Sequence, residues 1–230
     1  MISPFQRFDD GDVRALIAEY PLAWVVARGA DEDDGALLPL VGVHDAAGRL
    51  TEVVGHFARS NPLGAALAAD PSATLMFRGP EGYVSPEHAG RRDWAPTWNY
   101  AQLTVRGEIT LEPERTGEAL DMLIQAVEHD RAAPWRAGEL GPRYTRLLDQ
   151  IIGFRLRVDT VRGKFKLGQD ETIETLRAIL DNHPDPGLRR WMRRLNRARL
   201  SSPRSPWPRP LRLRSGVAPV IRLSSPRTGG

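Results

Sequence analysis

The chain has 230 residues, which suffices for one sizeable domain or two small ones. Hydrophobic residues make up 41% and charged residues 27%, a balance typical of a soluble globular protein. The longest strongly apolar run, Leu37–Val43, is far shorter than the roughly 20 residues that cross a membrane, and no signal-peptide pattern opens the chain. We therefore expect a cytoplasmic protein without membrane contact. The absence of cysteine excludes disulfides, thiolate metal sites and a cysteine nucleophile.

Positive charge is concentrated at the C-terminal end. The formal net charge is +3, yet twelve arginines and no acidic residue follow Pro186. The first 186 residues thus hold 20 basic and 29 acidic side chains, a net charge of −9. An acidic body is unlike a nucleic-acid-binding domain, whereas a basic tail could contact a polyanion. A solvated, disordered extension explains the same composition equally simply.

Apolar spacing and turn residues predict strands and a few helices over the first 182 residues. In chain order, the predicted elements are a helix over Asp10–Tyr20, strands over Leu22–Arg28, Ala36–His44 and Leu50–Phe57, a helix over Ser60–Asp70, strands over Ser72–Arg78, Gly82–Ser85 and Thr97–Glu112, helices over Pro113–His129 and Tyr144–Gln150, a strand over Ile151–Leu167 and a helix over Glu171–Asn182. Gly79-Pro80 should separate two strands, and Gly107 should bend the strand that contains it. Strands joined by turns, with few crossover helices, predict an antiparallel sheet or closed barrel in a mainly β protein with helices (α+β).

The composition changes at the end of this pattern. We expect one domain over residues 1–182 and a basic extension, rich in Arg, Pro and Ser, over residues 183–230. Within the extension, Leu188–Leu200 could form a basic helix with several arginines close to one face. From Ser201 onward the periodicity is lost, which is typical of disordered chain.

The common catalytic and metal-binding patterns are absent from the sequence. Its five histidines form no pair at a metal-binding spacing, and we predict no metal site. There is no nucleophile elbow, Walker loop or dinucleotide-binding glycine motif. Hydrolase and nucleoside-triphosphatase functions therefore have no local support, and no catalytic residue can be assigned.

Gly55–Pro62 carries binding chemistry where a strand leads into a predicted helix. Unpaired amides at a helix N-terminus attract phosphate, and Arg59 would add a bidentate donor. Ser60 and Asn61 would add polar groups beside it. An ordinary capping turn with a surface arginine explains the same residues.

Two further segments place aromatic residues next to turns. Gly79–Pro86 carries a tyrosine on a short strand, which a tight hairpin with a packed ring would explain. In Pro96–Tyr100, strand alternation would put Trp98 and the tyrosine on one face and Thr97 and Asn99 on the other. The polar pair could meet the edge of a planar heterocycle, or the aromatic pair could be core residues opposite a solvated face.

The chain contains only two lysines, Lys164 and Lys166, and both lie on one predicted strand. Residues at positions i and i+2 of a strand share a face. Because arginine supplies every other cation, two adjacent lysines suggest that a compact ammonium group is needed there. A strand edge protected by lysine against aggregation is the simpler explanation.

Four motifs together indicate a family. GHFARSNP, GPEGYVSP, APTWNY and KFKLGQ resemble, in the same order, the successive motifs of the PaiB-like FMN-binding negative transcriptional regulators. The resemblance extends from about Ser3 to about Asn182. It implies an antiparallel split β-barrel of the FMN-binding, pyridoxamine phosphate oxidase-like type. It also implies a homodimer with FMN in grooves between the protomers.

The resemblance implies which residues bind the cofactor. These residues are His56, Arg59, Ser60, Asn61, Thr97, Trp98, Asn99, Lys164, Lys166 and Gln169. The first four would face the phosphate, and the next three would lie near the cofactor or the dimer seam. The last three would approach the ribityl chain or the flavin ring, where a cation would stabilise reduced flavin.

This sequence departs from the family pattern in three places. Glu87-His88-Ala89 stands where the family usually has an aromatic pair, which would alter a flavin or substrate pocket. Gly168 and Asp170 replace the usual Ser and Asn. The C-terminus rich in Arg and Pro is not a family feature.

Several functions remain open at this point. Residues support flavin binding better than repression, because no helix-turn-helix is evident and the body is acidic; contact with DNA would fall to the basic tail. A flavin-dependent oxidoreductase or heme-handling enzyme is the alternative, with Tyr83, His56 or Lys164 moving protons. A dimeric barrel without flavin is a third possibility.

Overall fold

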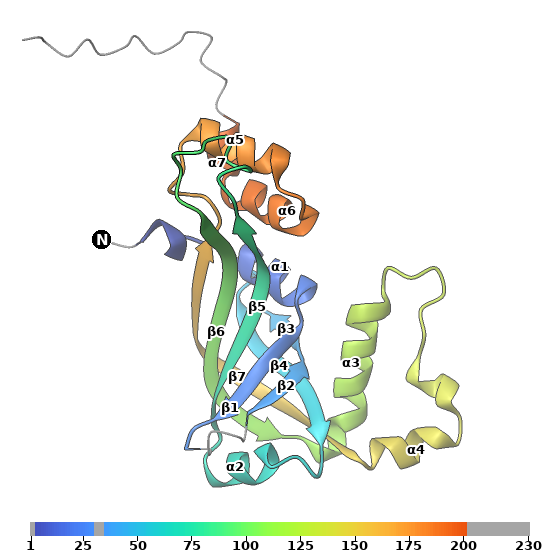
Figure 1. The fold of residues 1–230 in the computed structure, drawn as a ribbon. Coiled ribbons are helices and arrows are strands. Elements are labelled where there is room, and N and C mark those ends of the chain that lie inside the picture. The colour runs from blue at the N-terminus through green and yellow to red at the C-terminus, as the bar shows by residue number, and fades with distance from the viewer. Residues whose placement is uncertain (1–2, 30–34, 202–230) are drawn as a thin grey trace, which may run out of the picture.

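A computed structural model describes residues 3–29 and 35–201 as one curled sheet with helices around it (Figure 1). The strands are β1 (Leu22–Ala27), β2 (Ala36–Pro39), β3 (Val41–His44), β4 (Leu50–Ala58), β5 (Ser72–Val84), β6 (Thr97–Leu111) and β7 (Ile151–Lys166). They form a single antiparallel sheet in the order β2-β1-β5-β6-β7-β4-β3. Only Leu40 separates the two edge strands β2 and β3 along the chain. The sheet must therefore curve until its edges meet, which makes it a barrel.

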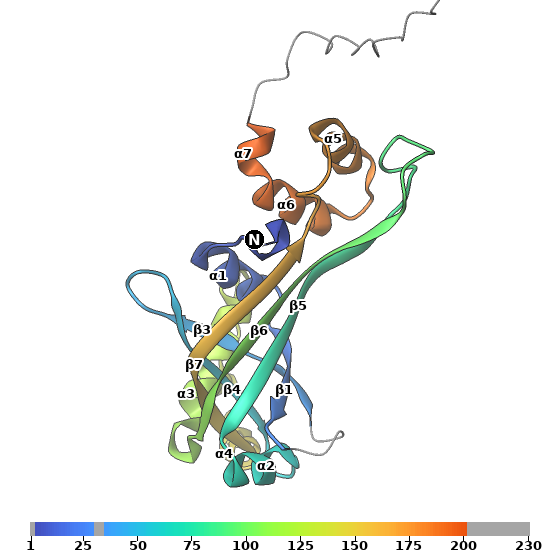
Figure 2. The same cartoon turned by 90° about the vertical axis from the view of Figure 1, so that its left-hand side faces the viewer.

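Helices lie at both ends of the barrel and along one side (Figure 2). They are α1 (Asp10–Glu19), α2 (Leu63–Ala69), α3 (Thr116–Glu128), α4 (Arg143–Leu148), α5 (Ile173–Asn182), α6 (Pro186–Leu195) and α7 (Arg197–Leu200), with 3-10 turns η1 (Pro4–Gln6), η2 (Pro113–Arg115) and η3 (Ala137–Leu140). In both views α5, α6 and α7 lie at the end where β5 stops, and α2 lies at the opposite end. No helix in the described part of the chain is long and apolar enough to cross a membrane.

The barrel interior is filled by alternate residues of the strands. Val25, Leu75, Leu103 and Leu156 are completely buried, and each such side chain contributes about 1.5–3 kcal/mol by leaving water. The opposite residues of the same strands form what we call the outer face of the sheet. Over β1, β5 and β6 no helix covers this outer face in the described part of the chain (Figure 2).

Two glycines let long strands bend. A Cβ at Gly107 would lie 1.9 Å from the carbonyl oxygen of Arg157, so β6 can approach β7 there only without a side chain. The strand register shifts between Arg106 and Gly107, which confirms the predicted bend. At Gly79 a Cβ would lie 2.9 Å from the side chain of Leu16.

The predicted division of β5 into two strands is wrong. Ser72–Val84 is one strand, and its register shifts between Arg78 and Glu81, where Gly79-Pro80 lies. A bulge tolerates a proline without breaking the strand, because the extra residues there need no ladder hydrogen bond. The bulge lengthens the β5–β6 hairpin beyond the barrel instead of ending it.

Two other predicted boundaries also shift. The strand expected over Ala36–His44 is interrupted at Leu40, where the chain turns between β2 and β3. The helix expected to begin at Ser60 begins at Leu63. The acidic run after β1, Asp31-Glu32-Asp33-Asp34, lies outside the described residues.

Residues 186–200 are part of the packed body. Leu188, Trp191 and Met192 of α6 are buried, and the Trp191 ring stacks on Phe165 at 6.1 Å. The predicted basic helix is thus present as α6 and α7, split at Asn196. A domain that ended at residue 182 would lose this packing. The disorder predicted beyond Ser201 concerns residues 202–230, which the structure does not describe.

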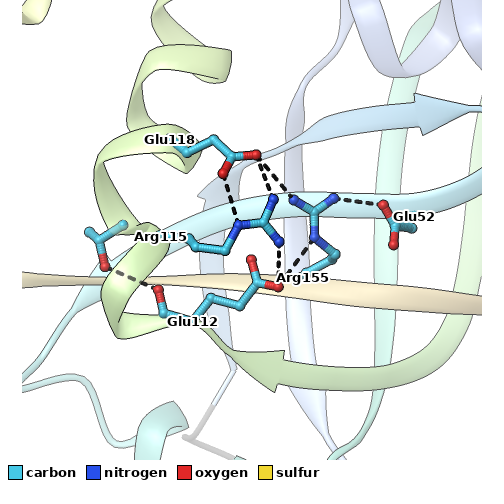
Figure 3. A network of polar contacts seen from close by, with 6 residues as sticks. Glu52, Glu112, Arg115, Glu118 and Arg155 are labelled. Carbon is cyan, nitrogen blue, oxygen red and sulfur yellow. Dashed lines mark hydrogen bonds and ion pairs between the residues drawn. The ribbon is translucent and has the colours of Figure 1, made fainter.

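An ion-pair network fastens α3 to the barrel (Figure 3). Arg155 of β7 contacts Glu52 at 2.6 Å, Glu112 at 3.3 Å and Glu118 at 3.8 Å. Arg115 joins the same group through Glu112 at 3.2 Å and Glu118 at 2.6 Å. The Arg155 side chain is only 15% exposed, so its charge depends on these three carboxylates.

Candidate functional site

The ten predicted cofactor residues fall into two groups at opposite ends of β7. Ala58, which precedes Arg59, pairs with Ile151 at the start of β7, whereas Lys166 ends that strand. The 16 residues of β7 span about 50 Å at roughly 3.3 Å per residue. We name the first group the Arg59 cluster (His56, Arg59, Ser60, Asn61) and the second the Lys164 cluster (Thr97, Trp98, Asn99, Lys164, Lys166, Gln169). Within one chain the two clusters are too far apart to hold one FMN.

In the Arg59 cluster, the arginine is held by the backbone before β7. Its amide donates to the carbonyl of Gln150 at 2.9 Å, and its Nε donates to the carbonyl of Asp149 at 3.0 Å. The side chain is exposed, and none of the described carboxylates pairs with it. A guanidinium fixed at Nε can still direct its terminal amino groups at a phosphate.

The helix beside this arginine is short and already capped. Asn61 Oδ1 accepts a hydrogen bond from the Leu63 amide at 3.0 Å. This amide, at the N-terminus of α2, is one of those predicted to bind a phosphate. With seven residues, α2 adds little dipole. Arg59 therefore remains the main candidate for anion binding in this cluster.

His56 faces α3. It pairs directly with Gly153, and directly opposed residues of antiparallel strands share a face. A Cβ at Gly153 would lie 3.0 Å from Thr116 and 3.3 Å from Ala119, both in α3. Burial lowers the pKa of His56, and its buried Nδ1 has no hydrogen-bond partner within the described chain. A neutral ring at pH 7 is what this environment favours.

The Lys164 cluster divides between the two faces of the sheet. Asn99 is buried, and its amide donates to the sulfur of Met192 at 3.6 Å. Trp98 is 55% exposed, and its ring lies 6.2 Å from the half-exposed ring of Tyr83. The interpretation of Trp98 as a core residue is therefore wrong. A polar edge formed by Thr97 and Asn99 is not open either, because α6 covers this end of the inner face.

Lys166 and Gln169 hold the end of β7 in place. The Lys166 ammonium donates to Thr97 Oγ1 and, at 3.0 Å, to the carbonyl of Trp98. The Gln169 amide accepts from Leu167 N at 2.7 Å and donates to the carbonyl of Phe165 at 2.6 Å. Their cofactor roles stay predictions, since both side chains have contacts within the chain.

Lys164 is the free cation of this cluster. Its Nζ lies 5.5 Å from the centroid of the Tyr100 ring, and no described carboxylate pairs with it. It is exposed on the outer face, on the same side as Trp98. A flat, electron-rich ligand on this face would meet an ammonium and aromatic rings together.

Sequence reasoning missed a hollow on the outer face. It has a volume of about 310 Å³ and is lined by Trp24, Met76, Tyr100, Gln102 and Thr104, among others. Trp24 and Met76 are 50% and 42% exposed. The signal was present in β1, because Leu22–Ala27 is apolar on both faces, which is typical of a strand covered on both faces. Here only one face is covered by the chain itself.

These residues fit FMN in kind. A phosphate would find Arg59, a flavin ring would find aromatic and apolar surface beside Lys164, and Gln102 and Thr104 offer polar groups within the hollow. The supply is divided between two ends of the molecule. Neither end of the described chain therefore holds the complete set.

The fold defines an antiparallel split barrel, and comparisons with known proteins agree. A family model described as "Putative FMN-binding domain" matches residues 1–160. The chain belongs to this family, and FMN as the predicted cofactor is confirmed at the level of the family.

Two curated relatives align with about half of the chain. Protease synthase and sporulation protein PAI 2 of Bacillus subtilis is 31% identical over 120 residues, which cover 51% of this chain and 58% of that protein. An uncharacterized protein of Emericella nidulans, AN0679, is 28% identical over 149 residues, covering 50% and 59%. The chain thus spans less than two thirds of the length of these relatives.

Two solved structures share the fold. The FAD and heme binding protein of Mycobacterium smegmatis matches with a TM-score of 0.53 and 20% identity, covering 76% of this chain and 80% of that one. The flavocytochrome Anf3 of Azotobacter vinelandii matches with a TM-score of 0.51 and 17% identity, covering 70% and 69%. At such identities the likeness concerns the fold alone, and it confirms the predicted barrel.

Proposed function

We propose that the protein binds FMN as a homodimer, with each flavin held by the Arg59 cluster of one copy and the Lys164 cluster of the other. The observation that carries this proposal is the separation of the two clusters along the 16 residues of β7. A two-fold axis across the outer face would place opposite ends of two sheets side by side. Each dimer would then have two equivalent flavin sites.

The outer face supplies the surface for such a dimer. Trp24 of β1 pairs with Leu37 of β2 and Met76 of β5, and all three side chains are 42–50% exposed. Leu22, on the same strand, is 51% exposed. A contiguous apolar patch of this kind is costly in water and favours a partner surface. A second copy presents the same patch and would cover it.

Different residues would bind different parts of FMN. Arg59 would bind the phosphate through charge-assisted hydrogen bonds, and Lys164 would place positive charge near the ring. Trp98 and Tyr83 would supply aromatic surface beside it. The bound flavin supplies electron and hydride transfer, so the protein needs only to position it and exclude competing contacts.

Titration of the purified protein with FMN, followed by flavin fluorescence and native mass, tests this proposal. We expect saturable binding of one flavin per chain and the mass of a dimer. A monomer, or no binding at high micromolar FMN, would overturn the proposal in favour of a barrel without flavin.

For the biological role, we infer a regulator of the PaiB type that acts through its flavin or a protein partner. Four arginines of α6 and α7 support this indirect action, because they contact other residues of the same chain. Arg190, Arg194 and Arg197 form ion pairs with α1 and its cap, and Arg199 donates to the carbonyl of Gly168 at 3.0 Å. Direct contact with DNA would fall to residues 202–230, which contain six arginines.

A flavin-dependent oxidoreductase or heme-handling enzyme is the second candidate. The exposed Tyr83–Trp98 pair favours it, since a second planar molecule could lie there beside the flavin. FMN-loaded protein that oxidises reduced nicotinamide would support an enzyme. Binding of duplex DNA from upstream of its own coding region at moderate salt, lost on removal of residues 202–230, would support direct regulation.

A further inference from the structure

A second hollow lies on the outer face, at the end of the barrel where α2 packs. Its volume is about 530 Å³, and it opens between β1, β5 and β6. Its polar lining includes Arg28, Ser72, Thr74, Arg106, Glu108 and Asp159. None of these residues belongs to the Arg59 cluster or the Lys164 cluster. We call this hollow the Arg106 pocket.

The strand register places two arginines on the same side of this pocket. Val26 pairs with Thr74, and Thr74 pairs with Arg106, so these three residues share the outer face. Arg28 lies two residues beyond Val26, and its amide donates to the carbonyl of Ser72 at 2.8 Å. Two strand spacings and a two-residue offset separate the arginine backbones by about 12 Å. One small anion can therefore meet both guanidinium groups.

The carboxylates of the pocket are engaged elsewhere. Arg157 contacts Glu108 at 3.0 Å and Asp159 at 2.8 Å. The bulge at Gly107 causes this arrangement, because Arg106 pairs with Thr160 and Gly107 with Val158, which leaves Asp159 as the extra residue. One arginine outside the pocket lining thus neutralises much of its negative charge.

Asp70 is the remaining carboxylate nearby. Hydrogen bonds from the hydroxyl and the amide of Ser72 lower the pKa of Asp70, and Arg28 adds only a weaker through-space attraction. The amide contact measures 2.8 Å. Asp70 therefore stays ionised, and its carboxylate accepts hydrogen bonds from Ser72.

Arg28 and Arg106 are left without a carboxylate partner in the described ranges. Both are exposed, and no described carboxylate forms an ion pair with either of them. Two arginines held at one hollow without an anion repel each other, unless a ligand supplies the charge. Thr74 stands between them with a hydroxyl that can donate to an oxyanion.

We infer that the Arg106 pocket binds the oxyanion group, phosphate or carboxylate, of a small molecule other than FMN. Arg59 lies at the end of β4, two strands away from β6 in the sheet, so a phosphate there leaves the Arg106 pocket free. Arginine suits this task because its planar fork binds two oxygens of one phosphate or carboxylate. The ligand is a substrate or effector of the flavoprotein, an assignment that rests on the proposed function.

Inorganic phosphate is the probe for this site. The full-length protein is titrated with phosphate by calorimetry, first alone and then after saturation with FMN. We expect one phosphate per chain at the Arg106 pocket in the FMN-saturated protein, and a second one without FMN, when the Arg59 cluster is also open. Arg106→Gln and Arg28→Gln should each weaken phosphate binding by about tenfold or more. Arg162→Gln is the matched control. Arg162 is exposed on the same face of the sheet, where it pairs with Thr104, two residues before Arg106 in β6.

The outcomes separate the possible sources of the signal. Equal weakening by Arg162→Gln would reveal a diffuse basic surface and overturn the inference. Loss of phosphate binding in the FMN-saturated protein, with Arg106→Gln weakening FMN but not riboflavin, would make this the flavin phosphate site and also overturn it. Absence of phosphate binding in both states would overturn the inference as well. Melting temperature and native mass establish that each variant folds and keeps its assembly.

Discussion

The Nε of Arg194 lies 2.6 Å from Oδ1 of Asp12, and this contact joins the C-terminal helix α6 to the N-terminal helix α1. Arg190 contacts Glu19 at 2.7 Å in the same interface. Asp12 is 5% exposed, so its charge relies on this partner and on the helix cap that it completes with Asp9. Acidic residues of α1 and its cap therefore neutralise three arginines of α6 and α7. Part of the positive charge that indicates a polyanion in the sequence serves this internal contact.

Removal of α6 and α7 is predicted to destabilise the protein. A chain that ends at Asp185 loses Leu188, Trp191 and Met192 from the core, whereas a chain that ends at Ser201 keeps them. Trp191→Ala alone should cost about 3–5 kcal/mol. Urea unfolding of both truncations and of the substitution measures the effect. Equal stability of the two truncations would contradict the packing described for α6.

Gly107→Ala is predicted to weaken the barrel strongly, because the new methyl group would meet the Arg157 carbonyl at 1.9 Å. Separating β6 from β7 at this point should cost about 3 kcal/mol or more. Gly138→Ala is the control, since nothing lies within 4 Å of a Cβ there. Thermal unfolding should show a large loss for the first variant only. A similar melting temperature for both would mean that the bulge relaxes easily.

Arg155→Met should destabilise the attachment of α3. The substitution removes the cation that contacts the partly buried Glu52 and leaves Glu112 with Arg115 alone, at a cost of about 3 kcal/mol. Arg49→Met breaks a pair with Asp45 on an exposed side chain and should cost less than about 1 kcal/mol. Denaturant midpoints of the two variants provide the comparison. If the Arg155 variant were as stable as the Arg49 variant, the network would be a surface feature.

Stability should fall as the pH drops below the usual pKa of histidine. Burial lowers the pKa of His56 in the folded protein, so the unfolded chain takes up a proton first as the pH falls. The contribution of neutral His56 to the free energy of unfolding is complete at pH values above the unfolded-state pKa of about 6.5, and it is lost on acidification. His44, whose pKa burial also lowers, adds an effect of the same sign. Unfolding of His56→Gln at pH 7.5 and 5.5 should show a smaller loss than the wild type; an equal loss would assign the effect elsewhere.

Sequence patterns predicted the elements but not all their connections. The barrel strands, α1 and the bend at Gly107 follow from alternation, caps and glycine, which are local signals. The single strand through Gly79-Pro80 could not be predicted, because a bulge and a strand break have the same residues. The packing of α6 depends on Trp191 meeting Phe165, a contact between segments whose composition differs. Contacts between residues far apart in the chain produce no periodic pattern in the sequence.

The site was predictable in residue type and not in arrangement. The four sequence motifs indicated Arg59 and Lys164 as cofactor residues. Their placement at opposite ends of β7 follows only from the strand register, which the sequence does not show. The backbone hydrogen bonds of Gln169 and the burial of Asn99 are likewise set by the fold. The Arg106 pocket could not be predicted, because nothing in the sequence distinguishes Arg28 and Arg106 from other surface arginines.

Arg59→Ala should weaken FMN binding by about tenfold or more, because a charge-assisted hydrogen bond to phosphate is worth about 1.5–3 kcal/mol. Riboflavin, which lacks the phosphate, should bind both proteins equally. Fluorescence titration with the two ligands measures the difference. Equal loss of both ligands would remove Arg59 from the phosphate site and assign it a structural role.

The most direct test of the shared flavin site is a mixture of two variants, Arg59→Ala and Lys164→Ala. Each variant alone forms dimers in which both sites lack one group. After exchange of subunits, a mixed dimer has one site with the intact Arg59 of one copy and the intact Lys164 of the other. FMN titration of the mixture should therefore recover a fraction of sites with wild-type affinity. If no such sites appear although native mass demonstrates mixed dimers, the flavin does not bridge the two clusters and the proposed site is wrong.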